Sequence, residues 1–152
     1  MSNQYNAFDT LISEIYENKL TKKIAYVDEF SSYTFENLKE SIEQVSYLIS
    51  DKGIVRNDRM LIAMLDRFSL PVTFLACIRS GVIPILSNTL LTQDDYQYML
   101  QDSDAKGVFV SPELQPLFSD LKSKLSFNQL ITEDEINTAI RSDKKERAQM
   151  VW

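Results

Sequence analysis

Apolar residues recur along much of the chain at the spacing of amphipathic helices. The clearest stripe lies over 35–49, where charged residues fill the opposite side and steps of three and four separate Phe35, Leu38, Ile42, Val45 and Ile49. Thr34 can cap the start of this helix, and Gly53 can end it. Weaker stripes predict five further helices, over 6–17, 71–80, 92–100, 112–125 and 132–141.

Short β-rich runs separate these helices. The unbroken apolar run 60–65 is typical of a strand that is covered on both faces, and further strands are predicted over 24–28, 33–35, 82–86, 106–111 and 127–131. The first two of these five can form a hairpin across 29–32. Because Pro84 cannot donate to a sheet ladder, the run 82–86 either starts at Ile85 or lies at a bulge or edge.

The alternation of strand, helix and strand predicts the fold class. Short connections favour parallel pairing through right-handed crossovers, which gives an α/β fold with a three-layer, doubly wound, mostly parallel sheet. We expect an α/β subdomain over 1–131. Residues 132–152 are then a capped helix and a charged tail that lead to a missing downstream region, because charged side chains dominate after Arg141.

Composition narrows the function classes. The chain has 152 residues, 44% of them hydrophobic, and a formal charge of -6, which disfavours nucleic acid and anionic membrane surfaces as partners. A single cysteine, Cys77, excludes an intramolecular disulfide, and the lack of histidine excludes the usual Cys/His zinc sites. With no basic, apolar start that would direct secretion, we expect a cytoplasmic protein.

The residues needed for nucleotide chemistry are missing from this sequence. Gly53, Gly81 and Gly107 lie far apart, so they form neither a dinucleotide fingerprint nor a P-loop. Without histidine, Cys77 or a serine has no ordinary general base, and we expect Cys77 to be a packing residue. The sequence therefore predicts no catalytic, cofactor-binding or metal-binding residue.

Charged groups beside predicted element ends have structural explanations. Two acidic clusters stand in first turns of helices, where the backbone dipole favours negative charge: Asp94-Asp95 and Glu133-Asp134-Glu135. Thr92 with Asp95, and Thr132 with Glu135, have the spacing of capping boxes. Asp66 and Arg67 follow the run 60–65, at the edge where α/β proteins place ligands, and we expect a loop ion pair there.

Four stretches carry a resemblance to a known family. They are Tyr33-Thr34-Phe35, Met64-Leu65-Asp66, Gly81-Val82-Ile83-Pro84 and the run from Asn88 to Leu100. These stretches resemble the N-terminal region of adenylate-forming acyl-CoA synthetases, the AMP-dependent synthetase/ligase family, and most of all benzoate–CoA ligases. The resemblance covers about residues 6–131 and is confined to scaffold sequence.

The resemblance implies a two-step reaction for a longer parent enzyme. An aromatic carboxylate such as benzoate attacks ATP to give an acyl adenylate, and CoA then displaces AMP; ATP, Mg and CoA are the implied cofactors. The family's phosphate-binding loop and downstream motifs have no counterpart here, so the chain is expected to be an N-terminal fragment that is inactive alone.

The expected partners and the rival hypotheses follow from that fragment hypothesis. The rest of the parent enzyme would be the main partner, and the exposed apolar face of a fragment predicts homodimers. The rivals are a stand-alone remnant that acts as a non-catalytic binding or interaction module, and a small flavodoxin-like ligand-binding domain.

Overall fold

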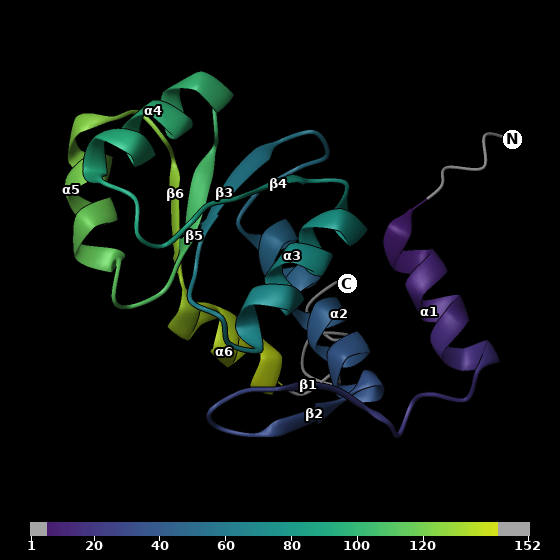
Figure 1. Ribbon diagram of the computed structural model, residues 1–152. Helices are drawn as coiled ribbons and strands as arrows, with labels where there is room; N and C mark the ends of the chain where they lie inside the picture. Colours follow the sequence, from purple (N-terminus) through teal and green to yellow (C-terminus); the bar gives the residue numbers. More distant parts are fainter. Residues whose placement is uncertain (1–5, 143–152) are drawn as a thin grey trace, which may run out of the picture.

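A computed structural model describes residues 6–142, in which six helices and six strands follow one another (Figure 1). The elements are α1 (Ala7–Glu17), β1 (Ile24–Val27), β2 (Ser32–Thr34), α2 (Phe35–Asp51), β3 (Arg59–Ala63), α3 (Ser69–Ser80), β4 (Ile83–Leu86), α4 (Gln93–Ser103), β5 (Gly107–Val110), α5 (Gln115–Lys124), β6 (Gln129–Thr132) and α6 (Glu133–Arg141). Over the described residues, no helix combines the length and the apolar character needed to cross a membrane.

Four strands form a parallel sheet in the order β4-β3-β5-β6. In its register, Met60 of β3 lies opposite Pro84 of β4 and opposite Gly107 of β5. Strand β3, the first of the four along the chain, is therefore internal in the sheet. The next strand, β4, lies on one side of it, and β5 and β6 follow on the other, so the strand order reverses between β3 and β5. Helices α2, α3 and α6 pack on one face and α4 and α5 on the other, which confirms the predicted three-layer α/β sheet.

The alternation of side chains along β3 divides the core into two layers. Met60 and Ile62 are buried among residues of α2, α3 and α6, whereas Leu61 and Ala63 are buried among residues of α4 and α5. The run is apolar throughout because both faces of this strand are covered.

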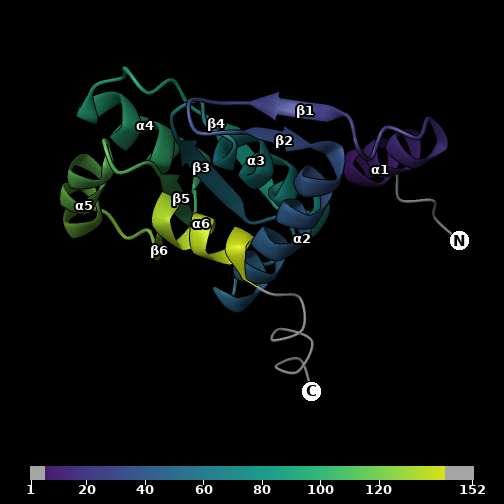
Figure 2. The same cartoon turned by 90° about the horizontal axis from the view of Figure 1, so that it is seen from below.

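Strands β1 and β2 form a separate antiparallel hairpin, as the sequence predicts. Figure 2 shows it running alongside the end of the larger sheet, with β1 as the outer strand. The ring of Tyr33 stacks on Phe68 with a centroid distance of 3.7 Å, and Tyr26 also approaches Phe68. Aromatic packing of this kind anchors the hairpin, because an isolated two-stranded hairpin is only marginally stable in water.

Local helix signals are mostly confirmed. Thr92 with Asp95, and Thr132 with Glu135, form complete capping boxes. Gly81 ends α3 in the left-handed conformation with φ at 72°, which only glycine adopts without a Cβ penalty.

Pro84 occupies an edge strand, which resolves the alternatives left open by the sequence. The N–H groups of Ile83 and Ser87 donate to Asp58 and Ile62, on the β3 side. By the alternation of a strand, the missing N–H of Pro84 faces the outer edge of β4, so no ladder bond to β3 is lost.

One predicted helix start is wrong. Ser111 and Pro112 do not open α5, which begins at Gln115 without a side-chain cap. Instead, the Ser111 hydroxyl accepts a hydrogen bond from the backbone N–H of Leu65 at 2.9 Å. A serine before a proline looks the same in the sequence whether its hydroxyl caps a helix or accepts a hydrogen bond from a distant backbone N–H. The tertiary contact decides between these two roles.

Candidate functional site

The carboxyl ends of β3, β5 and β6 meet at one edge of the sheet, and the turn of the β1–β2 hairpin lies beside them. Residues 64–68 follow β3, residues 111–114 follow β5, and α6 follows β6 directly. Ligands of open α/β sheets bind in the crevice outside the carboxyl ends of the strands, where the strand order reverses. The reversal between β3 and β5 makes this edge the candidate site.

Arg67 lies at the centre of this edge and contacts three carboxylates. Its Nη1 is 3.0 Å from Glu133, its Nε is 3.2 Å from Glu29, and its Nη2 contacts Glu113. The three acids come from the start of α6, the hairpin turn and the loop after β5. One guanidinium therefore joins four segments, and we call Arg67, Glu29, Glu113 and Glu133 the Arg67 cluster.

The charges of the Arg67 cluster stabilise one another. Hydrogen bonding to Glu113 raises the pKa of Arg67 above its already high ordinary value, although partial burial opposes this. The reciprocal hydrogen bond from Arg67 lowers the pKa of Glu113. Both groups are charged at neutral pH, so the cluster is an internal ion-pair network and not a proton-transfer device.

Glu133 is the buried member of the Arg67 cluster. Its side chain is only 4% exposed, and besides Arg67 it accepts a hydrogen bond from the Ser69 hydroxyl at 2.5 Å. It is also the first residue of α6, where the helix dipole favours an anion. The sequence explained Glu133 by the dipole alone and missed both partners.

The hairpin is held to the same edge by polar contacts. Burial raises the pKa of Asp28, but hydrogen bonds from the backbone N–H groups of Phe68, Phe30 and Ser31 outweigh it and leave that pKa lowered. Burial, followed by the hydrogen bond to Asp66, raises the pKa of Tyr26 to about 12.

The sequence predicted an ion pair between Asp66 and Arg67, and this prediction is wrong, because each residue has other partners. Asp66 accepts from the Tyr26 hydroxyl, and Arg67 turns to carboxylates that are distant in sequence. Adjacent residues in a loop point in different directions, so opposite charge at neighbouring positions does not by itself predict a pair.

A groove of about 270 Å³ lies beside the cluster, between the hairpin, the loop after β3 and α6. Its walls are Asp28, Phe30, Tyr33, Arg67, Phe68, Ser69, Glu133, Asn137, Ile140 and Arg141. Arg67, Asp28 and Glu133 already have the intramolecular partners described above. The arrangement can hold segments of the chain together, but it offers no base or nucleophile poised for chemistry.

Cys77 behaves as the sequence predicts. It is buried in α3, and burial raises the pKa of its thiol to about 12. The group stays protonated at neutral pH and packs as a small apolar side chain.

The acidic clusters at helix starts also have structural partners. Asp95 accepts the backbone N–H of Thr92 at 3.0 Å, and hydrogen bonds from Thr92 lower its pKa. Glu135 pairs with Lys52 at 2.7 Å. Between residues 6 and 142, no group of three or more Cys, Asp or Glu side chains could hold a metal ion.

The three glycines serve backbone geometry at separate places. Gly53 and Gly81 follow α2 and α3, whereas Gly107 begins β5, where an added Cβ would lie 2.3 Å from the carbonyl oxygen of Gln129. They do not converge on one turn, so these glycines do not fit a cradle for nucleotide phosphates.

Sequence reasoning missed two of the four members of the Arg67 cluster and the Ser69 hydroxyl that donates to Glu133. It singled out Arg67 and Glu133 but not Glu29, Glu113 or Ser69, whose partners lie 38, 46 and 64 residues away in the sequence. The one usable signal was the position of Arg67 after a buried strand, because that position marks the carboxyl edge.

The fold places this chain in the class of doubly wound α/β proteins. The charged side chains at the carboxyl edge of its sheet pair with one another. Comparison with known proteins places the chain in a family. The sequence pattern of the AMP-binding enzyme family matches residues 15–151, and the chain belongs to this family.

Relatives in this family confirm the resemblance seen in the sequence. Benzoate–CoA ligase of Thauera aromatica is 42% identical over 123 residues, which are 80% of this chain and 23% of the relative. The 4-hydroxybenzoate–CoA/benzoate–CoA ligase of Rhodopseudomonas palustris is 32% identical over 103 residues, 68% of this chain and 19% of that protein. This chain thus spans about a fifth to a quarter of the length of these relatives.

Solved structures give the same result. A benzoate CoA ligase from Burkholderia xenovorans LB400 superposes with a TM-score of 0.83 at 30% identity, covering 91% of this chain and 28% of the other. The chain is therefore similar to part of an acyl-CoA ligase in both sequence and fold.

Proposed function

We propose that this chain forms the N-terminal scaffold of an aromatic acyl-CoA ligase and is inactive alone. The observation that carries the proposal is the 42% identity to a benzoate–CoA ligase over 80% of the chain, but over only 23% of that enzyme. The full enzyme would convert benzoate or a related aromatic acid into its CoA thioester in the cytoplasm. The rest of that polypeptide is the proposed partner.

The chemistry proposed for the full enzyme needs ATP, Mg and CoA. A carboxylate oxygen attacks the α-phosphorus of ATP and pyrophosphate leaves; the CoA sulfur then attacks the acyl carbon, loses its proton, and AMP leaves. Adenylation is required because a carboxylate has no good leaving group of its own. The glycines of this chain do not fit a phosphate cradle, so no residue here is assigned to either step.

The structure supports a positioning role for the Arg67 cluster. By joining the hairpin turn, the loop after β3, the loop after β5 and the start of α6, Arg67 fixes the carboxyl edge of the sheet. In α/β enzymes, loops at this edge surround the ligand. A rigid edge would let the downstream part of the enzyme pack in one geometry.

A chimera tests the proposal. The matched 123-residue region of the Thauera enzyme is replaced by the corresponding part of this chain, and benzoate-dependent ATP–pyrophosphate exchange is measured. We expect exchange within about tenfold of the parent, because the graft replaces scaffold residues and leaves the downstream region intact. The 152-residue chain alone should give no exchange above background.

Two results would refute the proposal. Exchange catalysed by the chain alone would disprove its inactivity. A chimera with native circular dichroism and a sharp unfolding transition, but no exchange with any aromatic acid, would disprove the scaffold role and favour a non-catalytic binding or interaction module.

A further inference from the structure

Two loops at the carboxyl edge present large apolar side chains to solvent. Leu90, in the loop from β4 to α4, is 89% exposed, and Phe30, in the turn of the hairpin, is 73% exposed. These are the two highest values for large apolar side chains among residues 6–142. Figure 2 shows both loops on the same side of the molecule. Single exposed apolar residues are common on protein surfaces, so the structure of the two loops decides whether they mark a contact surface.

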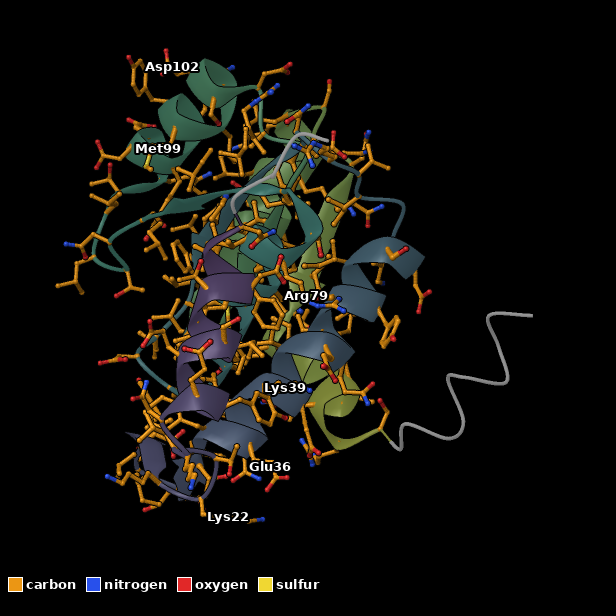
Figure 3. All side chains as sticks on the ribbon, turned by 90° about the vertical axis from the view of Figure 1, so that its right-hand side faces the viewer. Lys22, Glu36, Lys39, Arg79, Met99 and Asp102 are labelled. Atoms are coloured by element: carbon orange, nitrogen blue, oxygen red, sulfur yellow. The ribbon has the colours of Figure 1, made fainter. Side chains whose placement is uncertain are left out.

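The loop that carries Leu90 is fixed by hydrogen bonds. The side chain of Asn88 accepts the N–H of Leu90 at 2.9 Å, and the carbonyl of Asn88 accepts the Tyr96 hydroxyl at 2.6 Å. The hydroxyl of Ser87 donates to a carbonyl of β3 at 2.9 Å. The loop is thus tied to both α4 and the sheet. In Figure 3 it projects from the ribbon before α4, the helix that carries the labelled Met99.

The hairpin turn that carries Phe30 is fixed in a similar way. One carboxylate oxygen of Asp28 accepts the N–H groups of Phe30 and Ser31 at 2.9 and 3.0 Å, and the other accepts the N–H of Phe68 at 3.0 Å. The turn is thus tied to the loop after β3. Phe30, Tyr33 and Phe68 are aromatic walls of the groove described above, so a partner's side chain that inserts into the groove meets three rings.

The relatives of the chain point to the partner of this surface. Benzoate–CoA ligase of Thauera aromatica matches this chain over only 23% of its length, so more than three quarters of that polypeptide lies outside the match. Leu90 also belongs to the run from Asn88 to Leu100, which carries the family resemblance. A side chain that stays in water adds nothing to the core of this chain, so contact with the rest of such an enzyme gives it a role.

We propose that Phe30 and Leu90 are two anchors that bind the downstream part of the parent ligase to the carboxyl edge. One anchor projects from the hairpin turn and the other from the loop after β4. This inference rests on the function proposed above and names the surface through which that partner binds. Binding removes apolar area from water at both anchors, and it costs little conformational entropy because both loops are already ordered.

Thiol labelling tests whether the two anchors are covered. Phe30→Cys and Leu90→Cys are each made in this chain and in the chimera described above, and peptide mass spectrometry follows the rate of reaction with a maleimide at each position. Cys77 does not interfere, because it is buried and burial raises the pKa of its thiol to about 12. Val55→Cys is the matched control: Val55 is 59% exposed and precedes β3, at the amino end of the sheet.

All three introduced thiols should react rapidly in this chain alone. In the chimera, the thiols of Phe30→Cys and Leu90→Cys should react at least about tenfold more slowly, because a covered site reacts only when the contact opens. The thiol of Val55→Cys should react at the same rate in both proteins to within about twofold, because the proposed contact does not reach the amino end.

Two results would overturn the inference. The first is a chimera that catalyses exchange but whose thiol at either anchor reacts as fast as in this chain alone, which would leave the proposed function standing. The second is equal slowing at Val55→Cys, because the protection would then not be specific to the carboxyl edge.

The two readouts also separate the inference from the proposed function in the other direction. Slow labelling of both anchors in a folded chimera without exchange would support the docking surface and refute the scaffold role. If the chimera does not fold, the same substitutions at the aligned positions of the Thauera enzyme replace it. Slow labelling at both positions there would support the inference, and rapid labelling at either would overturn it.

Discussion

Both ends of the central sheet carry charged side chains, but the two sets are built differently. At the amino end, Lys106 pairs with Asp58 at 3.0 Å and donates to the carbonyl of Gly53. All of these groups lie beside the starts of neighbouring strands and are partly open to water. At the carboxyl end, Arg67 reaches three carboxylates from three other segments, and one of them, Glu133, is buried.

The difference shows how buried charge changes the role of an ion pair. A partly exposed pair such as Lys106–Asp58, whose side chains are 30% and 22% exposed, adds less to stability, because water still reaches either partner when the other is removed. Glu133 has almost no access to water, so removing Arg67 leaves a charge without compensation. We therefore expect the ion pairs at the carboxyl end of the sheet to contribute more to the free energy of unfolding than those at the amino end.

The largest effect is expected from Arg67→Met. The substitution keeps an apolar stem but removes the guanidinium from three carboxylates, one of them buried. We predict a loss of about 3 kcal/mol in the free energy of unfolding, measured by urea denaturation. A loss below about 1 kcal/mol would show that water or a rearrangement compensates Glu133.

The second prediction compares the losses of stability caused by replacing different acids of the Arg67 cluster. Glu133→Gln removes the buried charge and weakens the bonds from Arg67 and Ser69, and should cost about 2 kcal/mol. Glu29→Gln changes an acid that is mostly exposed and should cost no more than about 0.5 kcal/mol. Equal losses in the two variants would contradict the ranking by burial.

Acid should weaken the carboxyl edge. The folded pKa values of Asp28 and Glu113 are lowered from ordinary values of 3.8 and 4.5, so their contribution is fully present above those values. It is lost as the pH falls through the lower, folded values. The urea midpoint should be level from pH 7 to about 5.5 and fall below about 4.5, and Arg67→Met should reduce the fall.

At the amino end, the expected loss is smaller than that of Arg67→Met at the carboxyl end. Lys106→Met removes the partner of Asp58, whose pKa is lowered, against burial, by the N–H of Val55 and by Lys106. Because Asp58 keeps the Val55 bond, the loss should be at most about 1 kcal/mol in the same urea assay. A loss as large as that of Arg67→Met would erase the contrast between the two ends.

The sequence predicted the layers because local signals governed them. The stripe over 35–49, the run around Leu61 and the boxes at Thr92 and Thr132 depend on residues within one turn or strand, and all are present. Pro84 correctly marked an edge. Ser111 misled because its hydroxyl bonds Leu65, 46 residues away, instead of capping a helix.

The Arg67 cluster could not be assembled in the same way. Its contacts to Glu29, Glu113 and Glu133 span 38, 46 and 66 residues, and no periodicity records such distances. The position of Arg67 after a buried strand identified the edge. The identity of its partners depends on how the hairpin and α6 pack against that edge, which is a property of the whole fold.

A double-mutant cycle between Arg67 and Glu133 tests most directly whether the carboxyl edge is held by a buried ion pair. Urea unfolding of Arg67→Met, Glu133→Gln and the double variant gives the coupling energy. We predict about 2 kcal/mol, with the double variant clearly more stable than the sum of the two losses implies. A coupling below about 0.5 kcal/mol would contradict this account.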